Sequence, residues 1–126
     1  MAMLRRPEDA VELGLAGRRS REVLSGALGA MSTIRLVEIV VPKPGEAPRP
    51  PHWHPDSEEC IHVLAGEGTT WVDGTNIPVR PGDTLHVAPG ERHVTRNTGT
   101  APLVLLCFFP VPEITTLTEE TPANGP

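Results

Sequence analysis

The 126-residue sequence predicts an all-β domain, built as a sandwich or barrel of two sheets. Aromatic residues make up only 3% of the chain and tyrosine is absent, so the core must come from Val, Leu and Ile, which favour strands. Fifteen prolines and twelve glycines lie at regular intervals between short apolar runs. This spacing is typical of many short strands separated by turns. The length suits a single domain.

The chain divides into an N-terminal part over residues 1–32, a β-barrel over 33–112 and a polar tail over 113–126, which we expect to fray. Pro7–Leu15 predicts either a short helix or an extended arm, because Pro-Glu-Asp favours a helix N-terminus and glycines follow near its end. Ser20–Leu24 is a candidate edge strand. The arginines at positions 18, 19 and 21 are interpreted as a solvated turn.

Thr33–Val41 predicts a strand, because Ile34 and Leu36 alternate with charged residues. The Pro-rich segment 42–51 is expected to be an extended connector in polyproline II geometry. The Asp73-Gly74 pair predicts a hairpin. Further strands are predicted over residues 59–65, 69–73, 77–79, 84–88, 92–97 and 102–109.

Charge and composition argue against several classes of partner. The formal net charge of −5 disfavours nucleic acid and anionic membranes. No apolar run reaches 18 residues, so we expect no membrane span, and the first residues lack the apolar stretch of a signal peptide. With two cysteines, Cys60 and Cys107, a soluble cytoplasmic protein with reduced thiols is the simplest interpretation.

Three histidines and one carboxylate lie in two short segments, at spacings that suit a metal site. Alternate side chains of a strand share a face, so His52 and His54 can bind one ion together. Glu59 and His93 can complete the site only if a curled sheet brings separate strands together. Imidazole and carboxylate suit first-row divalent ions, and the lack of a thiolate in the pattern argues against a structural zinc site.

These segments resemble the two conserved motifs of the cupin superfamily. The first motif is present as His52-x-His54-x₄-Glu59-x₆-Gly66. The resemblance covers approximately residues 33–110 and is highly specific as a pattern. It implies a single jelly-roll β-barrel.

The second motif runs from Gly82 through Gly90 to His93 and Asn97, with Ala88 at a position where the family has proline. That difference affects a turn and no ligand. The resemblance implies a divalent transition metal, which would be Fe, Mn, Ni, Co or Zn. The ligands that it implies are His52, His54, Glu59 and His93.

Glu58 is the rival carboxylate, and otherwise a surface acid or a partner of a ligand. Asn97 is interpreted as a turn residue or a partner of a ligand. If Glu59 faces inward, strand alternation points Cys60 and His62 outward.

Arg92 and Arg96 have the opposite parity to His93, so no arginine clamp for a dicarboxylate is evident, which weakens an oxalate-type hypothesis. Trp53 and Trp71 are expected in the core or a subunit interface rather than at a substrate.

We expect a metalloenzyme that acts on a small organic molecule chelating the ion through oxygen. Fe or Mn would support a dioxygenase, oxidase or decarboxylase, and a redox-silent ion an isomerase, cyclase or dehydratase. The alternatives are a non-enzymatic module that binds or senses a small ligand, and a barrel with a structural or vestigial metal. The resemblance also implies a homodimer, in which residues 18–32 are a candidate for extending the partner's sheet.

Overall fold

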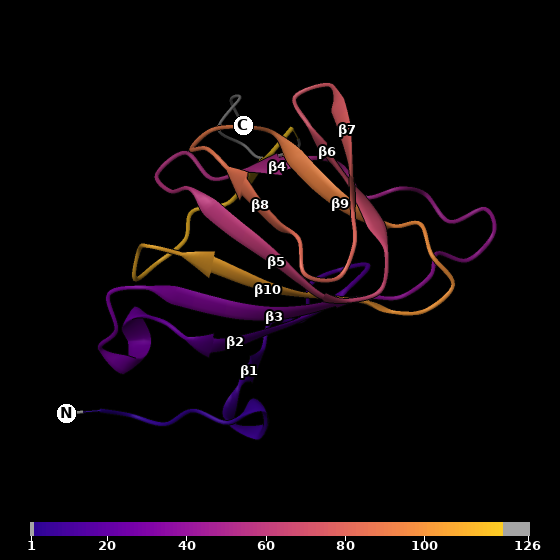
Figure 1. Ribbon diagram of the computed structural model, residues 1–126. Coiled ribbons are helices and arrows are strands. Elements are labelled where there is room, and N and C mark those ends of the chain that lie inside the picture. Colours follow the sequence, from indigo (N-terminus) through magenta and orange to yellow (C-terminus); the bar gives the residue numbers. More distant parts are fainter. Residues whose placement is uncertain (1, 120–126) are drawn as a thin grey trace.

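The computed structural model describes residues 2–119, and strands dominate it (Figure 1). Two 3₁₀ turns are present, η1 (Pro7–Asp9) and η2 (Gly26–Leu28). The strands are β1 (Val11–Glu12), β2 (Arg19–Leu24), β3 (Thr33–Ile39), β4 (His52–Trp53), β5 (Glu59–Ala65), β6 (Gly68–Val72), β7 (Thr75–Val79), β8 (Thr84–Val87), β9 (His93–Asn97), β10 (Leu103–Phe109) and β11 (Leu117–Thr118).

These strands form two antiparallel sheets. One has the order β1-β2-β3-β10-β5-β8 and the other the order β11-β4-β9-β6-β7. The predicted all-β jelly roll is therefore confirmed. Within residues 2–119, no helix is long and apolar enough to span a bilayer.

The predicted hairpin joins β6 to β7. Val72 pairs with Thr75, and the two residues between them, Asp73 and Gly74, have φ angles of 43° and 95°. Positive φ at both central positions is what a two-residue type I′ turn requires. The Asp-Gly pair therefore sets the register of these two strands.

The two ends of the chain differ from the predictions. A helix over Pro7–Leu15 is absent, and a single 3₁₀ turn and β1 stand in its place, so the extended alternative applies. The prediction that the tail frays from residue 113 is wrong for its first part. Leu117 pairs with Trp53 of β4, and Ile114 packs against the core, so apolar side chains hold this segment down. Residues 120–126 lie outside the described part of the chain.

The predicted strand over Thr33–Val41 is present as β3, and its inner face is the one opposite to Ile34 and Leu36. Val37 and Ile39 are buried, whereas Ile34 and Leu36 lie on the outer face, opposite apolar side chains of β10. The apolar residues of the outer face cover one another across the two strands. As a result, Arg35 points into the interior.

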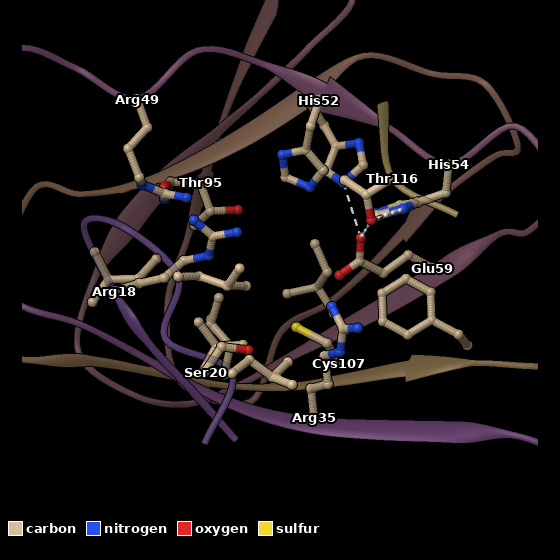
Figure 2. Close-up of a pocket in the computed structure, with 18 residues that line it drawn as sticks. Arg18, Ser20, Arg35, Arg49, His52, His54, Glu59, Thr95, Cys107 and Thr116 are labelled. Carbon is tan, nitrogen blue, oxygen red and sulfur yellow. Dashed lines mark hydrogen bonds and ion pairs between the residues drawn. The ribbon is translucent and has the colours of Figure 1, made fainter. Parts of the chain in front are cut away.

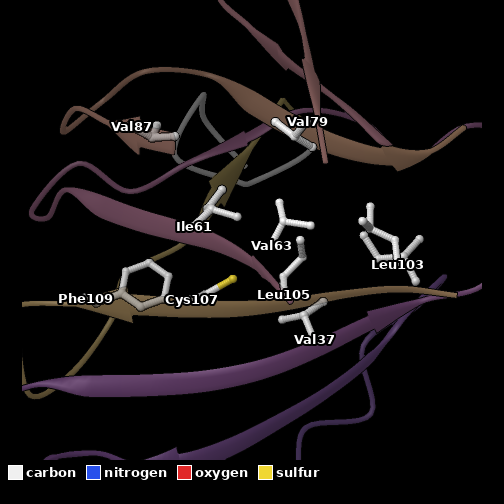
Figure 3. Close-up of a cluster of buried hydrophobic side chains, with 10 residues drawn as sticks. Val37, Ile61, Val63, Val79, Val87, Leu103, Leu105, Cys107 and Phe109 are labelled. Atoms are coloured by element: carbon white, nitrogen blue, oxygen red, sulfur yellow. The ribbon is translucent and has the colours of Figure 1, made fainter. Parts of the chain in front are cut away.

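The core fills the space between the sheets (Figure 3). Its largest contributions come from β5 and β10, whose alternate residues are buried. Several core residues also form the wall of a cavity, so the apolar core continues directly into the site described next. The core residues are Val37, Ile39, Ile61, Val63, Val79, Val87, Leu103, Leu105, Cys107 and Phe109.

Candidate metal centre

A cavity of about 270 Å³ lies between the two sheets and contains all four predicted metal ligands (Figure 2). His52 on β4 stands directly opposite His93 on β9, and His54 follows at the end of β4. Glu59 begins β5 in the other sheet. One ligand atom from each of the four residues lies within 4.8 Å of the others, so the group could hold a metal ion.

Backbone carbonyl groups orient two of the imidazole rings. Nδ1 of His93 lies 2.9 Å from the carbonyl oxygen of Glu91, and Nδ1 of His54 lies 3.1 Å from that of Thr115. A carbonyl oxygen only accepts, so each Nδ1 must donate its hydrogen. In the neutral rings Nε2 then carries a lone pair, which is the arrangement found in metal-binding histidines.

Both Nε2 atoms point at the same carboxylate oxygen. Oε1 of Glu59 lies 2.9 Å from Nε2 of His93 and 3.3 Å from Nε2 of His54. The longer contact is not a hydrogen bond, and Nε2 of His54 is buried without a hydrogen-bond partner among residues 2–119. A lone pair that faces a carboxylate oxygen is unfavourable unless a cation lies between them. The residues present therefore fit a divalent metal ion.

Burial and neighbouring charges set the protonation of the site. Burial alone would raise the pKa of Glu59, but its contacts with His54 and His93 hold this pKa well below its ordinary value. Burial would lower the pKa of His93, yet the Glu59 carboxylate raises it overall. Burial, followed by repulsion from His93, lowers the pKa of His52 to about 3. Glu59 is therefore charged and His52 neutral near pH 7, the forms in which each binds a metal.

Comparison with known protein families agrees with this geometry. A cupin domain family matches residues 38–109, which is more than half of the chain. The chain belongs to the cupin family.

The individual proteins to which this cupin is similar share about a third of the aligned residues or fewer with it. Protein SchB of Streptomyces halstedii is 33% identical over 102 residues, which span 77% of this chain and 73% of SchB. An oxalate-binding protein of Thermotoga maritima is 34% identical over 58 residues, or 46% of this chain and 48% of that protein. The structure of Lactobacillus farciminis oxalate decarboxylase in complex with formate superposes with a TM-score of 0.77 at 21% identity. The superposition covers 94% of this cupin but only 36% of the decarboxylase chain. At this low sequence identity, the likeness shows the fold alone.

Two further residues that the sequence offered as candidates, Glu58 and Asn97, do not contact the proposed metal ligands in the structure. Glu58 contacts the exposed His86, with 2.7 Å between Oε2 and Nε2, and it does not line the cavity. Asn97 is buried, but its amide donates to the carbonyl oxygens of Ile39 and Ala101 rather than to a ligand. Glu58 therefore lies on the surface, and Asn97 holds the turn between β9 and β10.

The sequence did not predict that arginines line the cavity. Neither Arg92 nor Arg96 lines it, as their parity indicates. However, Arg18, Arg35 and Arg49 do, so the interpretation of Arg18 as part of a solvated turn is wrong. Arg18 and Arg49 lie outside the strands, where no alternation rule applies, and Arg35 shares the inner face of β3 with Val37 and Ile39.

Cys107 also lines the cavity of this cupin. Burial, reinforced by the negative charge of Glu59, raises its pKa well above the ordinary value for a thiol. Cys107 therefore stays protonated and forms part of the apolar wall rather than acting as a thiolate ligand. Trp53 and Trp71 lie outside both the core cluster and the cavity.

Proposed function

We propose that this cupin binds one divalent transition metal ion through His52, His54, Glu59 and His93, and that it is an enzyme acting on a small organic molecule that chelates the ion through oxygen atoms. The observation that carries the proposal is the pair of ring nitrogens aimed at one carboxylate oxygen, one of them buried without a hydrogen-bond partner among residues 2–119. Three neutral imidazoles and one carboxylate would leave the centre with a net charge of about +1, which suits an oxygen chelator.

The bound ion would supply redox chemistry if it is Fe or Mn, or Lewis-acid stabilisation of an enolate if it is redox-silent. The first case corresponds to a dioxygenase, oxidase or decarboxylase, and the second to an isomerase or cyclase. The chain itself would orient the imidazole ligands and exclude water from the cavity. The carbonyl groups of Glu91 and Thr115 fix the rings, and apolar side chains such as Leu105 and Phe109 wall the cavity.

A second candidate function is binding of a small ligand without turnover. Within residues 2–119, Glu59 is the only carboxylate that lines the cavity, and the three histidines in that lining all belong to the proposed centre. No additional base is therefore placed beside a bound molecule by the described residues. The likeness to an oxalate-binding protein supports the same candidate.

Metal analysis followed by a turnover screen tests these functions. Protein purified without chelators is expected to contain one ion per chain. Oxygen uptake would then be measured with diketones, catechols and oxo-acids, and product formation by NMR without oxygen. Turnover of any of these supports the enzyme, whereas saturable binding without turnover supports the binding module. Protein that neither retains nor takes up Mn²⁺, Fe²⁺ or Zn²⁺ would contradict both.

We further propose that this cupin is a cytoplasmic homodimer that pairs through the outer face of its six-stranded sheet. That face carries the half-buried Ile34 and Leu36 of β3 opposite Phe108 and Leu106 of β10. Light scattering is expected to give twice the mass of one chain, and Leu36→Asp is expected to give a folded monomer. A monomeric wild-type protein would contradict this proposal.

A further inference from the structure

Two arginines enter the cavity without an acidic partner. Nη1 of Arg18 donates to the carbonyl oxygen of Ala16 at 3.0 Å, and Nη2 of Arg49 donates to that of Thr95. Among residues 2–119, neither guanidinium lies in a salt bridge. Arg35 differs, because its Nε lies 3.1 Å from a carboxylate oxygen of Glu22. Arg18 and Arg49 therefore keep several N–H donors for a ligand.

The side chain of Arg49 packs over Gly17, the residue that precedes Arg18. Gly17 has a φ of +75°, and a Cβ at this position would lie 2.7 Å from Cδ of Arg49. The aliphatic stem of Arg49 thus crosses the turn that carries Arg18, and only a glycine leaves room for it. Arg96 of β9 donates to the carbonyl oxygen of Arg49 at 3.3 Å, which fixes the Pro-rich segment 42–51 against β9. In Figure 2, the two guanidinium groups lie across the cavity from Glu59 and His54.

Electrostatics favours an anion beside these groups. Burial, followed by repulsion from Arg18 and Arg96, lowers the pKa of Arg49 to about 10. Burial and repulsion from Arg35 likewise lower the pKa of Arg18. The chain carries a formal net charge of −5, yet its cavity is lined by three arginines and one carboxylate, Glu59. A bound ion would offset the charge of that carboxylate, and Arg35 is paired with Glu22, which leaves Arg18 and Arg49 as uncompensated positive charge.

From this placement we infer that Arg18 and Arg49 form an oxyanion-binding subsite, and that the ligand of this cupin is a small organic acid with two functional ends. Oxygen atoms at one end chelate the metal, and a carboxylate or phosphate at the other end is held by the two guanidinium groups. The planar donor fork of arginine matches both oxyanions. The cavity of about 270 Å³ lies just below the range typical of drug-sized ligands, about 300–1,000 Å³. This inference rests on the proposed function, because it assigns the second end of a molecule whose first end is bound to the metal.

A pair of probes that differ only in charge tests the subsite. Co²⁺-loaded protein would be titrated with heptane-2,4-dione, a neutral diketone, and with 4,6-dioxoheptanoate, in which a carboxylate replaces the terminal methyl group two methylenes away from the same chelating diketone. Calorimetry and the visible spectrum of Co²⁺ both report binding without requiring turnover. The carboxylate probe is expected to bind at least about tenfold more tightly, as a charge-assisted hydrogen bond would give.

Variants show whether the arginines cause that preference. Arg18→Gln and Arg49→Gln are each expected to weaken binding of the carboxylate probe about tenfold and to leave the neutral probe and the metal content unchanged. Arg18→Lys keeps the charge but loses the fork, so it should lose part of the preference. Arg80→Gln removes an equal charge from an exposed site outside the cavity and serves as the matched control. Circular dichroism checks that each variant folds.

The outcomes separate this inference from the proposed function. If Co²⁺ does not bind, or neither probe binds, the proposed function fails and the subsite with it. If both probes bind equally, or the carboxylate preference survives in Arg18→Gln and Arg49→Gln, the subsite alone is overturned. Competition by acetate and by inorganic phosphate identifies the favoured oxyanion. These ions would compete with the carboxylate probe in the wild type and in a variant that carries both Arg18→Gln and Arg49→Gln. Stronger competition in the wild type supports the subsite, and equal competition in both proteins contradicts it.

Discussion

Glu59→Gln is expected to lower the affinity for Mn²⁺ or Zn²⁺ by at least about 100-fold, since losing even a partner of a ligand costs about 10–100-fold. The substitution removes the one negative charge that faces the Nε2 atoms of His54 and His93. The amide has nearly the same shape and can donate to Nε2 of His54, so the metal-free fold should persist. Competition against a chromophoric chelator measures the affinity, and elemental analysis of purified protein gives the content.

Glu58→Gln provides the matched control one residue away. The side chain of Glu58 is 41% exposed, contacts His86 at 2.7 Å and does not line the cavity, so this variant should bind metal as the wild type does. Weakened binding in Glu58→Gln with intact binding in Glu59→Gln would reverse the assignment of the carboxylate ligand.

The strands were predictable because their signals are local, and the convergence of the four candidate ligands was predictable because their spacing resembles the two motifs of a known family. Alternation along Glu59–Ala65 distinguishes a buried from an exposed face, and Asp73-Gly74 supports only a few turn geometries. His52 and His54 lie on one short segment, which fixes their relative directions, whereas Glu59 begins a strand of the other sheet and was placed beside them by the resemblance to the first cupin motif. The structure indeed brings these residues and His93 together.

The arginines were not predictable because their placement depends on contacts between distant segments. Arg49 reaches the cavity by packing over Gly17, 32 positions earlier, and no local pattern encodes that contact. Strand β3 was predicted correctly, but its inner face was not predictable, for a related reason. Ile34 and Leu36 have the apolar character of inward-facing residues, but on the outer face they pair with apolar side chains of β10, so hydrophobicity alone could not decide.

The C-terminal segment from residue 113 shows the same limit of prediction from local sequence. Its composition is polar, yet Leu117 and Ile114 suffice to bring it back to the sheet, where the carbonyl oxygen of Thr115 reaches His54. A segment expected to fray therefore orients a proposed metal ligand. The contact between Thr115 and His54 can be inferred only when the strand order is known, because β11 pairs with β4 across more than sixty residues of chain.

Metal affinity is expected to rise with pH, by about tenfold per pH unit for each proton that the ion displaces. His93 carries that proton in the metal-free protein, because its pKa is raised above 6.5 and its Nε2 donates to Glu59. Glu59 is already ionised, and His52, with a pKa of about 3, is already neutral. Calorimetry in buffers of different ionisation enthalpy should therefore detect release of at least one proton at about pH 6.

The same linkage predicts opposite trends in stability for the two forms. A raised pKa in the folded state means that His93 stabilises the metal-free protein fully below the unfolded value of about 6.5, and that this contribution is lost as the pH rises through its folded pKa. The ion replaces the proton between His93 and Glu59, so the metal-bound protein is spared that loss. The difference in Tm between the two forms should widen as the pH rises above about 6.5, and it should widen equally in His86→Gln, whose ring is exposed. A constant difference in Tm, with no proton released on binding, would mean that the ion does not bind at Nε2 of His93.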